Sequence, residues 1–326
     1  MIDDILNFPY WTILKNELHT LQKKDIRILS FTNQDYPRRL LSLSNAPSLL
    51  FYKGNADLNA EKVIAVVGTR SPSEYGKQIT EQLIRQLAQP GLVIISGLAF
   101  GIDSCAHSAA LKNDIPTIGV LGHGLSRIYP HEHTGLAKAM TQKGGLLTSF
   151  GWDMGPEYFH FPQRNEIVAG LCDALLVVET GRKGGSLITV GKAQEFGKKI
   201  FAVPGRLTDP RSAGCNLLIS QGKAELLVSG EQLQARMGWK WPAGQKGSQA
   251  QLSFSKSEPP LPFSTPSDHT APQKVLLKLL RESQNLSLDE LTTRSQLSGP
   301  DVAINLLTLE LQGLISVLPG RRYQLS

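Results

Sequence analysis

Cysteine is scarce in this sequence, with three residues in a chain of 326. Cys105, Cys172 and Cys215 stand far apart, with no CxxC pair and no histidine at the spacing of a zinc site. Neither a disulfide framework nor a metal centre is indicated, so we expect buried or neutral thiols and no bound metal.

Long hydrophobic runs are also missing. No apolar stretch approaches the roughly 18 residues that a membrane-spanning helix needs. The first residues, MIDDILNF, are acidic and lack the basic and apolar regions of a secretory signal. We therefore expect a cytoplasmic protein without a membrane segment.

A strong excess of one charge is absent as well. The chain has 34 Lys and Arg residues against 28 Asp and Glu, a net charge of +6. This mild basic excess permits a nucleic-acid partner without requiring one. Because no segment is a basic tail, a site for anions has to be assembled by folding.

The sequence does contain short, almost purely apolar runs that alternate with helical patterns. Strands buried on both faces have this composition, which is typical of a parallel sheet covered by helices on each side. The runs are KVIAVVG (62–68), LVIISG (92–97), TIGVLG (117–122), ALLVVE (174–179) and KIFAVPG (199–205). We therefore predict an α/β domain over residues 58–235, a Rossmann-like, doubly wound, mostly parallel sheet.

The flanking segments differ from this domain. Residues 1–57 are predicted to be a short lead-in, and residues 236–271, rich in Pro, Ser, Gly and Gln, a flexible linker. Residues 272–326 show the element order of a winged helix. The predicted elements are helices over 274–283, 288–294 and 299–312, and strands over 315–318 and 322–325 around Pro319-Gly320.

The predicted sheet strands end in small-residue loops that open into helices. Ligands bind at the carboxyl ends of such strands, where helix N-termini present N–H groups to anions. The loops are Gly68-Thr69-Arg70-Ser71, Ser96 to Gly101, Gly122-His123-Gly124 and Gly181 to Ser186. None matches GxGxxG or GxxxxGK[ST], so we expect no dinucleotide or other cofactor.

Basic and aromatic side chains in or near these loops suggest how a ligand would be held. Arg70 follows a strand directly, and Arg182, Lys183 and Lys199 would add positive charge if they face the same edge of the sheet. Phe161 adjoins Arg164 and is the first candidate for stacking on a base. Phe100, Tyr129 and Phe159 are further candidates, although a place in the core is the stronger expectation for each of the four rings.

Several motifs together resemble the DNA-processing protein A (DprA/Smf) family. They occur in the order VVGTR, SGLAFGID, YPHEH, FPQRNEIVAGL, VVETGRKGGSLIT, KKIFAVPG and GCNLLISQGKA, and the resemblance covers residues 35–228. It implies a homodimer without enzymatic activity that binds single-stranded DNA independently of sequence. It further implies that the protein protects incoming DNA in natural transformation and helps to load the RecA recombinase.

The resemblance also implies functional residues. The DNA-contacting arginine of the family corresponds to Arg70, its RN loop to Arg164 and Asn165, and its glycine-rich loop to Gly184, Gly185 and Ser186. The DNA-binding residues predicted in all are Gly68, Thr69, Arg70, Ser96, Gly97, Gly101, Phe161, Arg164, Asn165, Arg182, Lys183, Gly184, Gly185, Ser186 and Lys199.

The sequence departs from the family pattern in three places. Glu166 stands where RNRIIAGL has a basic residue, which weakens the positive charge expected of this segment. The usual Ser-Glu after the GG strand is replaced by Thr148-Ser149-Phe150. The helical N-terminal domain of many members is expected to be largely absent, because the chain has only about 34 residues before DYPRRL.

A nucleotide-binding phosphoribohydrolase-like enzyme is the alternative on the same fold. Such enzymes carry a PGGxGTxxE loop, and the nearest counterpart here, KGGSLITVG, lacks both the Gly-Thr pair and the acid. Of the nearby acids, Asp103 fits a structural place in the first turn of a helix. Glu179 could orient the loop that follows it or pair with an arginine of these loops. We therefore predict no catalytic residues.

The winged helix has little positive charge on the helix that usually enters the major groove. Its third predicted helix contains no Lys or Arg and carries Asp301 and Glu310, and only the wing, with Arg321 and Arg322, is basic. Because phosphates repel carboxylates, we hypothesise a protein-contact or auxiliary module rather than a sequence reader. A module that merely spaces or stabilises the protein is the open alternative.

Overall fold

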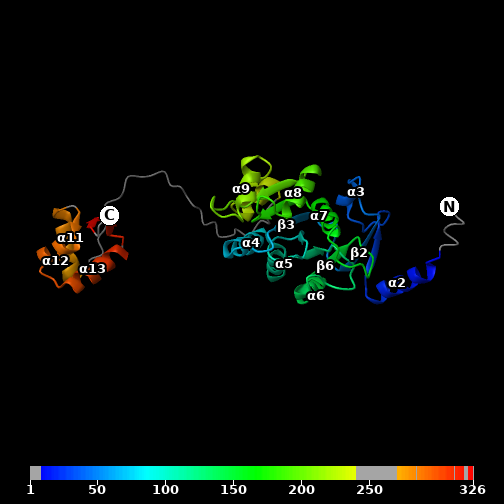
Figure 1. Cartoon of the computed structure of the whole chain (residues 1–326), viewed down its shortest axis with the longest axis horizontal. Helices are drawn as coiled ribbons and strands as arrows, with labels where there is room; N and C mark the ends of the chain where they lie inside the picture. The colour runs from blue at the N-terminus through cyan, green and yellow to red at the C-terminus, as the bar shows by residue number, and fades with distance from the viewer. Residues whose placement is uncertain (1–8, 240–269, 284, 312, 319–321, 326) are drawn as a thin grey trace. The chain divides into compact units, whose positions relative to one another are not determined.

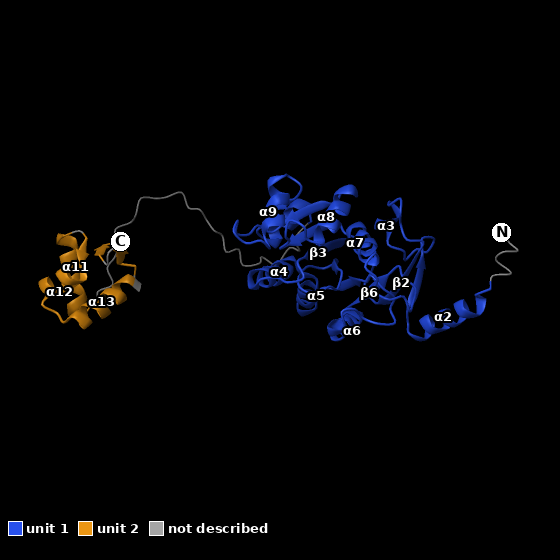
Figure 2. Ribbon diagram, viewed as in Figure 1, with its two compact units in different colours: residues 1–249 blue, residues 250–326 orange. Residues whose placement is uncertain are grey.

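The computed structural model describes residues 9–239, 270–283, 285–311, 313–318 and 322–325. The chain divides into two compact units, residues 1–249 and 250–326 (Figure 2). The predicted linker falls mostly on residues 240–269, which lie outside the described residues. The first two residues of the predicted linker belong to helix α10 (Gly230–Met237). Its last residue, Ala271, is the first of helix α11 (Ala271–Glu282).

A nine-stranded sheet forms the centre of the first unit, in the order β1-β2-β6-β5-β4-β3-β7-β8-β9. The strands from β6 to β9 in this order are parallel, while β1 and β2 pair antiparallel at one edge. The strands are β1 (Arg27–Ser30), β2 (Leu49–Gly54), β3 (Lys62–Gly68), β4 (Leu92–Ser96), β5 (Thr117–Val120), β6 (Gly144–Thr148), β7 (Ala174–Val178), β8 (Lys199–Ala202) and β9 (Glu225–Leu226). The predicted mostly parallel α/β sheet is confirmed.

Helices cover both faces of this sheet (Figure 1). Val63, Ala65 and Val67 of β3 pack with helices α3, α7, α8 and α9, whereas Ile64 and Val66 pack on the opposite face with α4, α5 and α10. This alternation explains why β3 is apolar at nearly every position. The helices are α2 (Trp11–Lys23), α3 (Arg38–Leu41), α4 (Glu74–Leu87), α5 (Ile102–Lys112), η1 (His131–His133), α6 (Thr134–Lys143), α7 (His160–Leu171), α8 (Ser186–Glu195), α9 (Ala213–Ser220) and α10 (Gly230–Met237).

Strand β6 is not among the five strands predicted from apolar runs, because it begins with two glycines. The ring of Tyr52 from β2 lies against Gly145, where a Cβ would clash with it, and the Tyr52 hydroxyl donates to the Gly144 carbonyl at 3.0 Å. The glycines therefore make room for β2, and residues 27–54 of the predicted lead-in supply two strands of the same sheet.

A buried histidine lies between α5 and β5. His107 is fully buried, its Nδ1 lies 2.7 Å from the Thr117 hydroxyl, and its Nε2 has no hydrogen-bond partner. Burial lowers the pKa of His107 to about 3. A proton would add a charge without a partner, which explains the direction of the shift.

This histidine should make the fold acid-sensitive. Its folded pKa lies below the unfolded one, so the unfolded chain takes up the proton first, and stability is lost as the pH falls from about 6.5 towards 3. We expect His107→Leu to reduce this loss by up to about 1.4 kcal/mol per pH unit. Urea unfolding of the wild type and the variant between about pH 4.5 and 7.5 measures this difference. Parallel pH dependences of the two unfolding free energies would contradict the prediction.

The second unit is a winged helix, as predicted. Three helices pack around a core that includes Leu276, Leu291 and Leu306, beside a three-stranded sheet in the order β10-β12-β11. The elements are α11 (Ala271–Glu282), β10 (Leu286–Ser287), α12 (Leu288–Ser295), α13 (Gly299–Leu311), β11 (Ile315–Leu318) and β12 (Arg322–Leu325). The predicted turn at Pro319-Gly320 lies outside the described residues. Among the residues described, no helix has the length and apolar character to cross a bilayer.

Candidate functional site

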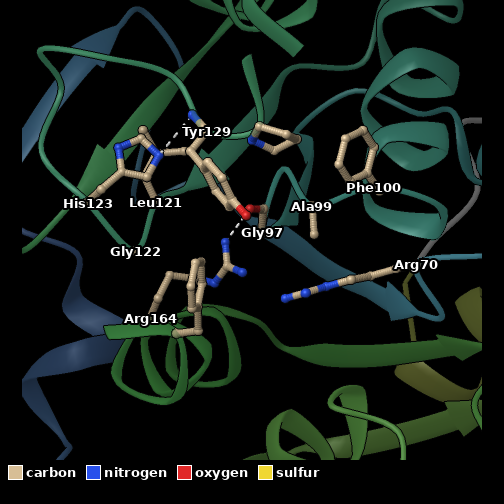
Figure 3. Close-up of a pocket in the computed structure, with 11 residues that line it drawn as sticks. Arg70, Gly97, Ala99, Phe100, Leu121, Gly122, His123, Tyr129 and Arg164 are labelled. Atoms are coloured by element: carbon tan, nitrogen blue, oxygen red, sulfur yellow. Dashed lines mark hydrogen bonds between the residues drawn. The ribbon is translucent and has the colours of Figure 1, made fainter. Parts of the chain in front are cut away.

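A pocket lies where the carboxyl ends of β3, β4 and β5 meet the first turns of α7. We call the loops that follow β3, β4, β5, β7 and β8 the carboxyl edge. The residues that line the pocket are Arg70, Gly97, Ala99, Phe100, Leu121, Gly122, His123, Tyr129, Pro130, Phe161 and Arg164 (Figure 3). Two arginines and no carboxylate are among them, so the pocket suits an anion.

Arg70 is the exposed cation of this pocket. It lies two residues beyond the end of β3, and its guanidinium is 5.9 Å from the centre of the Phe161 ring. No ion pair or hydrogen bond engages its side chain within the described parts of the chain. An arginine in this state presents its whole donor fork to a ligand.

Arg164 reaches the same pocket from α7 but is only 5% exposed. Its Nη1 donates to the Gly97 carbonyl and, at 2.7 Å, to the Val120 carbonyl, while Nε donates to Asn165 Oδ1 at 3.0 Å. The guanidinium therefore joins the ends of β4 and β5. Arg70 and Arg164 extend toward one another across the pocket (Figure 3).

The charge of Arg164 is balanced by Asp103, a buried carboxyl in the first turn of α5. Burial raises the pKa of Asp103, and the Arg164 charge opposes this rise. Burial in turn lowers the pKa of Arg164, and Asp103 opposes that shift. Asp103 Oδ2 also accepts the N–H groups of Gly97 and Ala99, at 3.1 and 3.3 Å. The acid thus orders the β4–α5 loop, in addition to lying in the first turn of a helix as predicted.

Aromatic side chains form the wall of the pocket. Phe100 is 44% and Tyr129 52% exposed, so both rings offer a free face. Phe100 contacts the His133 ring edge-on at 5.0 Å, and Tyr129 lies 6.2 Å from Phe161. Rings fixed in this way beside cations are what unstacked bases require.

Glycines are needed where the loops approach one another. Gly101 has φ of +83°, and a side chain there would collide with the backbone of Thr69 and Arg70. At Gly97 a Cβ would collide with the Arg164 guanidinium, and at Gly68 with the Val178 carbonyl. These glycines bring Arg70 and Arg164 into one pocket.

The β7–α8 loop lies at the same edge, because β7 is the neighbour of β3. Arg182 and Lys183 are exposed there, although neither lines the pocket. Gly184, Gly185 and Ser186 complete the loop, in which Ser186 Oγ donates to Thr180 Oγ1 at 2.7 Å. These residues extend the positive edge beyond the pocket.

Several predicted site residues have other roles. Lys199 begins β8, so it lies at the opposite edge of the sheet, and its Nζ donates to the Arg236 carbonyl at 2.5 Å. Ser96 is buried and ties β4 to the Val66 carbonyl of β3 at 2.5 Å. Both expectations are corrected: the patterns located the strands, but neither side chain lines the pocket.

Glu166 does not reduce the charge of the pocket. It is on α7 but not in the pocket lining, and its Oε1 lies 2.9 Å from Lys192 Nζ of α8. The residue that departs from the family pattern therefore forms an ion pair between two helices. The expected loss of positive charge at the site is not found.

Other residues of the site were missed by the sequence analysis. Arg206 and Arg211 are exposed on the loop that follows β8, and Arg211 Nε donates to the Ser71 carbonyl at 3.1 Å. Their position after the apolar run KIFAVPG was the available signal. Leu121 and Pro130 also line the pocket; they lie in the run TIGVLG and the motif YPHEH but were not named as site residues.

The side chains that line the pocket can hold an anion and stack on a flat ring. No carboxylate lines the pocket, and the buried Glu179 is engaged by Ser73. In the part of the chain that is described, no group of three or more His, Cys, Asp and Glu side chains is placed to hold a metal ion.

Comparisons with known proteins identify the family of the chain. Residues 27–238 match the model of the DNA recombination-mediator protein A family, and residues 258–321 match the DprA winged helix domain. Protein Smf of Escherichia coli is 35% identical, with 97% of this chain and 81% of that protein covered. DNA processing protein DprA of Bacillus subtilis is 39% identical, with 69% and 75% covered.

Two solved structures are also similar. DNA processing protein A of Streptococcus pneumoniae superimposes with a TM-score of 0.63 at 41% identity, over 69% of this chain and 78% of that one. The protein from Helicobacter pylori, whose structure is described in terms of its single-stranded DNA binding mode, gives 0.59 at 30% identity, over 65% and 95%.

Proposed function

Because the chain belongs to the DNA recombination-mediator protein A family, we propose that its carboxyl edge binds single-stranded DNA without sequence preference. The strand would be the incoming DNA of natural transformation or a recombination intermediate. Backbone phosphates and base faces are common to all sequences, so arginines and rings are sufficient recognition elements.

The exposed Arg70 guanidinium is the observation that carries this proposal. It lacks a protein counter-ion among the described residues and stands beside the rings of Phe161, Phe100 and Tyr129. A phosphate on Arg70 would leave the adjacent base within reach of these rings. Arg182, Lys183, Arg206 and Arg211 would meet further phosphates of the same strand.

The location, oligomeric state and partner that we propose are taken from the family resemblance. We place the protein in the cytoplasm as a homodimer that protects the bound strand and delivers it to the RecA recombinase. No step in this role requires the chain to break a bond, and no carboxylate is among the residues that line the pocket. Gly68, Thr69, Gly97, Gly101 and the Gly184-Gly185-Ser186 loop are proposed to shape the DNA path.

Fluorescence anisotropy of a labelled oligo-dT, titrated over a series of salt concentrations, tests the function. We expect salt-dependent binding that duplex DNA displaces poorly and AMP does not displace. Absence of binding to the oligonucleotide, together with AMP binding or hydrolysis, would instead identify a nucleotide-processing pocket.

The winged helix is proposed to act as a protein-contact or auxiliary module. The outer face of α13 presents Ile304 and Leu307, 64% and 57% exposed, with Asp301 and Glu310 beside them. Arg322 of the wing is already occupied, because Nη2 donates to the Asn285 carbonyl at 2.6 Å and approaches Glu290 at 3.5 Å.

Duplex DNA should therefore bind this unit weakly. For the fragment 270–326, which has a core of its own, we expect a Kd above about 1 μM at physiological salt, within the range of non-specific binding. Anisotropy with a labelled duplex measures it. Submicromolar binding by the fragment would overturn the assignment.

A further inference from the structure

Glu179 is an unusual residue at the carboxyl edge. It follows β7 directly, has φ of +49°, and is only 2% exposed. A left-handed backbone is uncommon for a residue other than glycine, and a buried carboxylate needs compensation. Both costs are tolerated at functional sites when the surrounding structure requires that conformation.

The contacts of Glu179 explain what it does. We call residues 69–73 the Arg70 loop. At the start of this loop the Thr69 N–H donates to the Glu179 carbonyl at 2.7 Å. At its end the Ser73 N–H donates to Glu179 Oε2 at 2.8 Å, and the Ser73 hydroxyl donates to Oε1. One residue therefore holds both ends of the loop that carries Arg70.

The residues around the Glu179 carboxylate favour its negative charge and leave little free space beside it. Ser73 is the N-cap of α4 and accepts the Gly76 N–H at 3.1 Å, so the Glu179 carboxylate lies at a helix N-terminus, which favours negative charge. A side chain at Gly76 would collide with Oε2. Further contacts fix the middle of the loop, since Ile102 N–H donates to the Thr69 carbonyl and Arg211 to that of Ser71.

We infer that Glu179 is a positioning residue, which sets the guanidinium of Arg70 for a phosphate without touching the DNA. The inference rests on the proposed function and deepens it. It also predicts an effect opposite in sign to simple electrostatics. Removing a negative charge near a phosphate site should tighten binding, whereas loss of the loop anchor should weaken it.

A double-mutant cycle in the full-length protein tests the inference, with oligo-dT anisotropy as the readout. We expect Glu179→Gln to weaken binding about fivefold to tenfold, and by less than about twofold when Arg70 is already alanine. Ser73→Ala, which removes one of the two donors to the carboxylate, should weaken binding in the same coupled way. Glu74→Gln is the matched control, because it removes an exposed carboxylate from the first turn of α4 without touching the loop.

The outcomes separate this inference from the proposed function. Failure of the wild-type protein to bind oligo-dT rejects the function itself. Suppose instead that the wild type binds and Arg70→Ala is defective. The role of Glu179 is then rejected if Glu179→Gln binds as tightly as the wild type, or if the loss of affinity in the double variant is the product of the two single losses. If Glu179→Gln does not fold, the Ser73→Ala cycle decides: coupled losses support the inference and independent losses overturn it.

Discussion

Arg70→Ala should weaken single-stranded DNA binding by roughly 1 to 3 kcal/mol, by a similar factor for every sequence. The side chain is exposed, and among the described residues it makes no ion pair or hydrogen bond, only a contact with the Phe161 ring at 5.9 Å. Its removal should therefore take away a phosphate contact with little effect on the fold. The slope of log affinity against log salt should fall by about one contact. Anisotropy titrations with oligo-dT and a mixed-sequence oligonucleotide measure both quantities.

Arg85→Ala provides the control for charge alone. Arg85 is exposed in the last turn of α4, and therefore at the opposite edge of the sheet, so the variant has the same net charge as Arg70→Ala. Its affinity and salt slope should remain near those of the wild type. Equal losses in the two variants, or an unchanged slope in Arg70→Ala, would remove Arg70 from the site.

The sequence predicted the framework of this site better than its details. Apolar runs such as KVIAVVG identify buried parallel strands because burial on both faces leaves no polar positions. Once these strands are placed, the carboxyl edge and the position of Arg70 follow from topology. Arg164 was supplied by the family resemblance alone and Phe161 by its place beside Arg164 in the sequence; the structure has both in the lining of one pocket.

Side-chain direction could not be predicted in this way. Ser96, the last residue of β4, points into the sheet. Lys199 is a different case, because it is the first residue of the run KIFAVPG and the topology already places it at the amino end of β8, away from the carboxyl edge. Whether Glu166 faces the pocket depends on its partner Lys192, which is 26 positions away and on another helix. The directions of the Ser96 and Glu166 side chains are decided by packing between elements. A single sequence contains no local signal for such packing.

The two arginines of the pocket should respond differently to substitution. Arg164→Ala is expected to destabilise the first unit by about 2 to 4 kcal/mol, because the buried carbonyls of Gly97 and Val120 lose a charged donor and a cavity remains. DNA binding should fall as well, since the β4–α5 loop is no longer tied to the end of β5. Arg70→Ala, in contrast, should unfold like the wild type.

Urea unfolding followed by tryptophan fluorescence measures this difference. No tryptophan lies in residues 250–326, and Trp239 packs against the core of the first unit, so tryptophan emission reports on that unit. Arg164→Lys, which retains the charge but not the fork of donors, should be intermediate. Wild-type stability in Arg164→Ala would show that the guanidinium is a ligand contact and not part of the framework.

The stability defect of Arg164→Ala should also depend on pH. The positive charge of Arg164 opposes the burial that raises the pKa of Asp103, so its loss raises that pKa further. When the pKa of a carboxyl is higher in the folded state than in the unfolded state, the protonated carboxyl contributes to the stability of the fold. This contribution to stability is lost as the pH rises through the pKa of the folded state. The difference between variant and wild type should therefore be larger at pH 7 than near pH 4. A difference that does not vary with pH would mean that Asp103 and Arg164 are not coupled, and that the buried arginine acts through its hydrogen bonds alone.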